Sequence, residues 1–162
     1  MSEGIAELAS DVRIAYEIHG RDSGPTLLLL HGFTLDRRMS WPQVEALAPH
    51  FRVVSYDARG FGASSLPGPE RFSHAEDAAA LCAHLGLTQV IAVGHSIGAH
   101  QMLELALPRP DLVCGFAALA LSGLSSVPFS DDLKALFAAL EKTARTDGVA
   151  SAKALWAASG WF

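Results

Sequence analysis

Basic residues, cysteine and long apolar runs are all scarce in this sequence. Twelve lysines and arginines stand against 17 aspartates and glutamates, which gives a formal net charge of −5 at pH 7. Such a balance offers no basic surface for nucleic acid or for an acidic membrane. No apolar run approaches the ~20 residues of a membrane-spanning helix, and the first residues lack the basic and apolar segments of a signal peptide. We therefore expect a cytoplasmic protein whose partner is a small molecule, with no nucleic acid and no membrane.

The two cysteines do not have the spacing of a metal site or of a redox motif. Cys82 and Cys114 each lie inside an apolar pattern, and neither has a second cysteine or a histidine at ligand spacing. We expect both to be buried hydrophobic residues in a reduced compartment, and we expect no metal ion.

The order of apolar patterns indicates a single α/β domain. At 162 residues, half of them hydrophobic, the chain is long enough for a full core and too short for two domains. Strands are predicted at 12–18, 26–30, 51–56, 90–93 and 112–121. Helical spacing separates most of these strands. This alternation predicts a mostly parallel sheet with helices on both faces, and 112–121 is expected to be a further buried strand.

Serine residues begin three of the predicted helices. The stretches Ser40-Trp41-Pro42-Gln43 and Ser73-His74-Ala75-Glu76 have the spacing of a capping box. Gly86 is expected to end the helix that Ser73 begins. Ser130 is expected to cap an amphipathic helix over 130–146.

Residues 94–98 carry the most specific chemical signal. They read Gly-His-Ser-Ile-Gly, after a strand pattern and before a helical one. A strand that reverses into a helix within a few residues leaves Ser96 on a tight, strained turn, which closes only if Gly94 and Gly98 lack bulk. The turn exposes the Ser96 hydroxyl and directs the backbone N–H of Ile97 into the same space. A plain glycine-serine turn is the alternative, but the flanking strand and helix favour a nucleophile with half of an oxyanion hole.

With this pentapeptide in that context, the sequence resembles the α/β-hydrolase family. The resemblance extends to His31-Gly32-Phe33, because in the family an H-G-x stretch follows the third strand. The backbone N–H of the third residue in that stretch is the family's other oxyanion donor. The resemblance therefore implies that Phe33 and Ile97 form the oxyanion hole, and it implies no metal and no organic cofactor.

The resemblance also gives roles to the residues around the two loops. His95 belongs to the turn of the nucleophile, and Gly32 belongs to the loop that supports the oxyanion hole. His31 precedes Ser96 in the chain, whereas the family's catalytic base follows the nucleophile. The resemblance therefore makes His31 a support for the loop and not a base.

A second stretch, Asp57-Ala58-Arg59-Gly60-Phe61-Gly62-Ala63-Ser64, resembles the family's D-x-R-G-x-G-x-S loop. Its glycines partly mimic a dinucleotide-binding fingerprint. However, Ser65 stands at the place of the third glycine, and Leu66-Pro67-Gly68-Pro69 follows where a helix should begin. A dinucleotide-binding fold is therefore disfavoured, and Asp57 and Arg59 are expected to be partners that brace the loop.

The remaining members of a catalytic triad are missing from the expected places. In the family the acid and then the histidine follow the nucleophile, on loops after later strands. The only histidine after Ser96 is His100, which belongs to the following helix. The acidic residues after Ser96 are Glu104, Asp111, Asp131, Asp132, Glu141 and Asp147. We therefore expect a family member truncated after its sixth strand, with part of the core over 1–126 and the beginning of a helical cap over 127–162.

The resemblance implies a serine hydrolase that acts on carboxylic esters, lactones or related acyl substrates, with Ser96 as the nucleophile. Perhydrolase, carbon–carbon bond hydrolase and hydroxynitrile lyase activities stay open. A serine in place of an aspartate disfavours epoxide opening and halide displacement. Without a base and an acid, the chain is expected to hydrolyse esters poorly or not at all. The alternative is a non-catalytic half-hydrolase that oligomerises or binds a ligand.

The strand at 112–121 also predicts self-association. In the family the sheet continues past this strand, so here the strand would present an unpaired, strongly apolar edge. We expect a homo-oligomer in which the sheet edge or the cap helices of one chain cover those of another.

Overall fold

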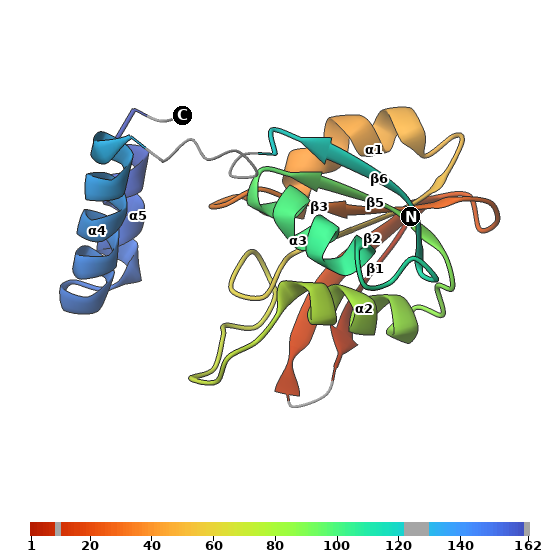
Figure 1. The fold of residues 1–162 in the computed structure, drawn as a ribbon, viewed down its shortest axis with the longest axis horizontal. Coiled ribbons are helices and arrows are strands. Elements are labelled where there is room, and N and C mark those ends of the chain that lie inside the picture. Colours follow the sequence, from red (N-terminus) through yellow and green to blue (C-terminus); the bar gives the residue numbers. More distant parts are fainter. Residues whose placement is uncertain (9–10, 122–129, 161–162) are drawn as a thin grey trace. The chain divides into compact units, whose positions relative to one another are not determined.

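The computed structural model describes residues 1–8, 11–121 and 130–160. The chain forms two compact units, Met1–Ser122 and Gly123–Phe162. The first contains a six-stranded sheet with its helices, and the second contains a pair of helices (Figure 1). The predicted boundary between residues 126 and 127 and the end of the chain at Phe162 lie outside the described residues.

The sheet is mostly parallel, as predicted. Its strands are β1 (Ser2–Glu7), β2 (Arg13–Gly20), β3 (Thr26–Leu30), β4 (Arg52–Tyr56), β5 (Val90–His95) and β6 (Val113–Leu119). They lie in the order β1-β2-β4-β3-β5-β6. β2 runs antiparallel to both β1 and β4, and every other pair is parallel. The parallel strands therefore all end at one edge of the sheet, which is where the sequence motifs lie.

The first strand, β1, is not among the strands that the sequence predicts. Its residues include two glutamates and a glycine, which favour strands weakly, and only Ala6 is buried. β1 pairs with β2 over its whole length, from Ser2 opposite Ile18 to Glu7 opposite Arg13. Pairing with a neighbouring strand, and not a local pattern, therefore makes this segment a strand.

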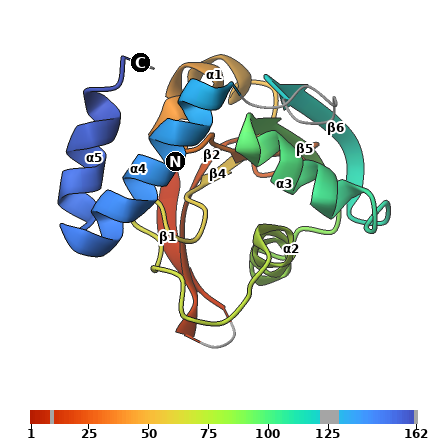
Figure 2. The same ribbon diagram turned by 60° about the vertical axis from the view of Figure 1, so that its left-hand side comes forward.

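Helices cover both faces of the sheet (Figures 1 and 2). α1 (Trp41–Leu47) packs on one face, where Val44 joins a small core cluster with Leu27, Leu29 and Val53. α2 (His74–His84) and α3 (Ile97–Ala106) pack on the other face over a larger cluster. The alternating apolar patterns therefore predicted the layers of the fold.

Of the two serines predicted to cap a helix within a capping box, Ser73 makes its N-cap hydrogen bond and Ser40 does not. The Ser73 hydroxyl accepts a hydrogen bond from the Glu76 N–H (3.3 Å), and Gly86 ends the helical segment at a φ of +64°. At α1, a 3₁₀ helix (Arg37–Ser40) precedes the α-helix and leaves Ser40 at φ −88°, ψ 0°, with no side-chain cap bond. The Ser40 prediction was wrong because an N-cap side chain reaches the first turn from an extended backbone, which the 3₁₀ helix excludes.

The strand at 112–121 is an exposed edge and not a buried strand. β6 is the last strand of the sheet, and the exposed fractions of Phe116 and Leu119 are 37% and 49%. Cys82 is buried as expected, but Cys114 is exposed because it lies on this edge strand. The continuous apolar run indicated a strand buried on both sides. As the edge strand of this unit, β6 is not buried on both sides.

The second unit is a helical hairpin. α4 (Asp131–Thr146) begins as predicted, with the Ser130 hydroxyl accepting from the Leu133 N–H (3.3 Å). α5 (Val149–Ala157) follows Gly148, and the rings of Phe137 and Trp156 stack with their centroids 6.3 Å apart. Neither helix has a buried residue. Among the described residues, no helix combines the length and the apolar character needed to cross a membrane.

The two serines give a matched test of helix capping. Ser73→Ala removes an N-cap hydrogen bond and should lower the free energy of unfolding by about 1 kcal/mol. Ser40→Ala removes no cap bond and should change it by less than about 0.5 kcal/mol. Urea denaturation of both variants measures the difference, and equal losses would contradict the assignment of the caps.

Candidate active site

The loops after β3 and β5 meet at the carboxyl edge of the sheet. The two strands are neighbours and pair in parallel from Leu27 opposite Ile91 to Leu30 opposite Gly94. After β3 the chain passes over one face through α1, and after β5 it passes over the other face through α3. Connections that leave neighbouring strands toward opposite faces open a crevice between them, which is where open α/β sheets bind ligands.

Ser96 stands between β5 and α3 in a strained backbone conformation. Its φ is +53° and its ψ is −119°, a region that residues with a side chain rarely adopt. The Ser96 N–H donates to the Leu119 carbonyl (2.8 Å), and the Ser96 carbonyl accepts from the Ala99 N–H (3.0 Å). The side chain makes no cap hydrogen bond to α3. The backbone of Ser96 is therefore held at both ends while its hydroxyl is not used by the helix.

Gly94 and Gly98 permit this turn because each lies against another backbone. A Cβ on Gly94 would lie 2.5 Å from the Cα of Ala99, and a Cβ on Gly98 would lie 2.7 Å from the carbonyl oxygen of Leu30. Either contact is too short for real atoms. The second contact also shows that the turn at Ser96 packs directly on the end of β3, just before the loop at His31–Phe33.

Ile97 is the first residue of α3, so its N–H has no partner within the helix and points out of the positive end of the helix dipole. Phe33 lies in the loop after β3, with its ring edge-on to Phe61 at a centroid distance of 6.1 Å. The side chains of Phe33 and Ile97 are exposed. The two residues predicted to donate to an oxyanion therefore both carry exposed apolar side chains.

His31 connects the loop after β3 to the end of β4. It is buried, its Nε2 accepts from the Ala58 N–H (3.0 Å), and its Nδ1 therefore carries the proton that it donates to the Gly32 carbonyl (2.7 Å). Burial lowers the pKa of His31, so the ring is neutral at pH 7. Because both ring nitrogens have backbone partners, His31 is not available to take a proton from Ser96.

Two further histidines, His95 and His100, lie close to Ser96 in the chain. The His95 ring lies against Gly32, where a Cβ would approach its Nδ1 to 2.8 Å. His100 lies on α3, and its backbone N–H donates to the Ser96 carbonyl (3.4 Å). Three of the acidic candidates form ion pairs with basic residues close to them in the chain: Asp111 with Arg109, Asp131 with Lys134 and Glu141 with Arg145.

Asp57 and Arg59 are not partners of each other, which corrects the sequence prediction. Asp57 is fully buried and pairs with Arg37, whereas Arg59 pairs with Asp77. The sequence analysis missed Arg37 altogether. The available signal was a carboxylate at the end of a buried strand, which requires a buried cation, but nothing in the spacing selects Arg37 over the other arginines.

A family model of the α/β hydrolase fold matches residues 25–159. The chain belongs to this family. It is 35% identical over 109 residues to a 2-(acetamidomethylene)succinate hydrolase of Mesorhizobium japonicum, which is 66% of this chain and 39% of that protein.

Solved structures of other α/β hydrolases have the same fold. A thermophilic esterase from Thermogutta terrifontis is 30% identical, with a TM-score of 0.73 over 91% of this chain and 55% of that one. The epoxide hydrolase CorEH is 28% identical, with a TM-score of 0.74 over 95% of this chain and 54% of that one. The chain thus spans about half of the length of these structures and 39% of the succinate-derivative hydrolase.

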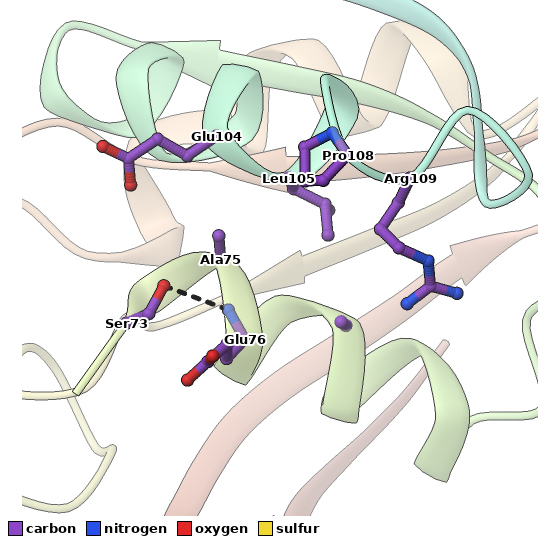
Figure 3. A pocket seen from close by; sticks show the side chains of 8 residues that line it. Ser73, Ala75, Glu76, Glu104, Leu105, Pro108 and Arg109 are labelled. Carbon is purple, nitrogen blue, oxygen red and sulfur yellow. Dashed lines mark hydrogen bonds between the residues drawn. The ribbon is translucent and has the colours of Figure 1, made fainter.

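A hollow of about 320 Å³ lies elsewhere in this α/β hydrolase, between α2 and α3 (Figure 3). The carboxylates of Glu76 and Glu104 lie toward one end of it and the guanidinium of Arg109 toward the other. Neither Ser96 nor the residues of the loop after β3 line this hollow. It is therefore separate from the turn at Ser96.

The close approach at Gly98 can be tested by adding one methyl group. Gly98→Ala must push the turn away from β3 and should lower the free energy of unfolding by about 2 kcal/mol. Gly68→Ala is the control, because a Cβ there meets no atom within 4 Å. Urea denaturation compares the two variants, and a Gly98→Ala protein as stable as Gly68→Ala would contradict the packing described here.

Proposed function

We propose that this chain carries the nucleophile and the oxyanion hole of a serine hydrolase that acts on carboxylic esters, lactones or related acyl compounds. The observation that carries the proposal is the conformation of Ser96. A non-glycine residue at φ +53° costs on the order of 1–3 kcal/mol, and such strain gathers at active sites. Here the strained residue stands directly before the first residue of α3, where a plain turn would need no strain.

The proposed reaction begins with attack of the Ser96 Oγ on the substrate carbonyl carbon. The carbonyl oxygen becomes an oxyanion, which the N–H groups of Phe33 and Ile97 stabilise together with the positive end of α3. The leaving group departs with a proton, an acyl-serine forms, and water releases the acid. Each such oxyanion donor is typically worth about 10²–10³ in rate.

The substrate class follows from the residue at position 96 and from its surroundings. A serine favours acyl chemistry over the opening of epoxides, although an epoxide hydrolase is among the similar structures. An esterase is among them as well. The exposed apolar side chains of Phe33 and Ile97 favour a neutral acyl group with apolar substituents over a charged one.

We assign no general base to a residue of this chain. Both nitrogens of His31 are occupied, and His100 belongs to α3. Without a base and an acid, the oxyanion hole and substrate binding alone support a residual rate enhancement of about 10³–10⁴ over water. The activity of these 162 residues is therefore expected to be weak, and the cytoplasm remains the location that the composition predicts.

A fluorophosphonate probe tests the nucleophile directly. Ser96 should be labelled slowly, Ser96→Ala should abolish the labelling, and Ser2→Ala should leave it unchanged. Mass spectrometry of the digested protein locates the modified residue. The alternative is a non-catalytic half-hydrolase that oligomerises or binds a ligand. Labelling at no serine would support that alternative and would contradict the proposal.

We also propose that the chain self-associates through β6. β6 carries no charged residue, whereas the opposite edge strand, β1, carries Glu3 and Glu7. An uncharged apolar edge pairs readily with another strand.

Light scattering at micromolar concentration should give the mass of a dimer or a higher oligomer, and Ala118→Lys should reduce it to the monomer mass. A monomer mass for the unchanged chain would contradict this proposal.

A further inference from the structure

Arg37 forms an ion-pair cluster with two buried carboxylates. The cluster lies beside the loop after β3, which contains His31, Gly32 and Phe33. The Nε of Arg37 donates to Oε1 of Glu17 (2.9 Å), and its Nη1 donates to Oδ2 of Asp57. Its backbone N–H donates to the other oxygen of Asp57, Oδ1 (2.8 Å). Asp57 is fully buried, and Glu17 is only 7% exposed. One residue of the loop is therefore fixed by both its side chain and its backbone.

The partners of Arg37 belong to two different strands of the sheet. Glu17 lies on β2 and Asp57 follows β4, so the guanidinium reaches from the loop after β3 across β4 to β2. Asp57 also accepts from the Ala63 N–H (2.8 Å), and its carboxyl group occupies the space where a Cβ on Gly62 would lie. The carboxylate that holds Arg37 is thus itself held in place.

The loop is attached to the end of β4 at two points, and Phe33 lies between them. At the first point, the Nε2 of His31 accepts from the Ala58 N–H (3.0 Å). At the second point, Arg37 binds Asp57, the residue before Ala58. Gly32 and Phe33 belong to the short span between these anchors. Releasing either anchor therefore removes one of the two ties that hold this span to the end of β4.

Stability alone is a weak explanation for such a cluster. A buried ion pair loses much of its attraction to the cost of removing both charges from water, and apolar replacements are often neutral or stabilising. Burial also opposes ionisation of Glu17, although hydrogen bonds from His19 and Arg37 more than offset this and lower its pKa. What an apolar replacement does not supply is a fixed direction for the backbone.

We propose that Arg37 is a positioning residue that aims the Phe33 N–H at the oxyanion. The inference rests on the proposed function of Ser96 and adds a residue to it. Arg37 touches neither the substrate nor the reacting atoms in this account, and it acts through Asp57 and the loop. A displacement of about 1 Å in an aligned group costs on the order of 10²-fold in rate, so loosening the loop should be measurable.

Arg38 provides a matched control. It is the next residue in the chain and also an arginine, but its side chain is 66% exposed and pairs with Asp36. Arg37→Ala should slow fluorophosphonate labelling of Ser96 by about ten- to a hundred-fold. It should also speed hydrogen–deuterium exchange at the Phe33 amide. Arg38→Ala should change both rates by less than about two-fold, because a surface ion pair of this kind fixes little.

Chemical rescue separates positioning from a general loss of structure. A hollow of about 520 Å³ is lined by Glu17, His19 and Trp41 among others, and it gives a small cation access to Glu17. Millimolar guanidinium ion should therefore restore most of the labelling rate of Arg37→Ala and leave the rate of Arg38→Ala unchanged. If Arg37→Ala does not fold, Arg37→Lys keeps the charge and loses the fork, and its Ser96 should be labelled more slowly than that of Arg38→Ala.

The outcomes distinguish this inference from the proposed function. If the unchanged protein is not labelled at Ser96, the proposed function is wrong, and exchange at Phe33 still tests the anchor. Suppose instead that Ser96 is labelled, and that the Arg37 variants that fold match Arg38→Ala in both the labelling rate and the exchange rate at Phe33. The positioning role is then wrong and the proposed function stands. Slow labelling that guanidinium does not restore would also overturn the inference.

Discussion

The turn at Ser96 depends on a close approach between two backbones. Gly98 packs on the last carbonyl groups of β3, and Gly94 packs on the first turn of α3, so neither position has room for a side chain. This contact brings the loop after β3 next to the start of α3, and Ser96 between them has a positive φ. Ser96, the N-terminus of α3 and the H-G-F loop therefore meet because two glycines allow strand and helix to touch.

Buried polar contacts then fix the second half of the site. His31 and Arg37 attach the loop to the end of β4, one through the Ala58 N–H and the other through the Asp57 carboxylate. The two glycine contacts place the turn at Ser96 against the end of β3, and the two polar contacts tie the loop to the end of β4. An oxyanion hole needs both, because its donors act only at the correct distance and direction.

The sequence predicted the layers of the fold, the motif and its neighbouring strands, because apolar periodicity and glycine spacing are local signals. It did not predict β1, which depends on pairing with β2, or the failed cap at Ser40, which depends on the preceding 3₁₀ helix. It paired Asp57 with Arg59, its neighbour in the chain, although the partner is Arg37. Contacts between distant charged residues leave no periodic trace, so the cluster around Arg37 is visible only in three dimensions.

A crystal structure of the protein after reaction with a phosphonate probe would show directly whether Ser96 faces the two proposed oxyanion donors. A covalent phosphonyl group on Ser96 mimics the tetrahedral intermediate, and one of its oxygens stands for the oxyanion. We expect this oxygen to lie about 2.7–3.1 Å from the backbone nitrogens of both Phe33 and Ile97. An adduct on another residue, or an oxygen directed away from these two N–H groups, would contradict this expectation.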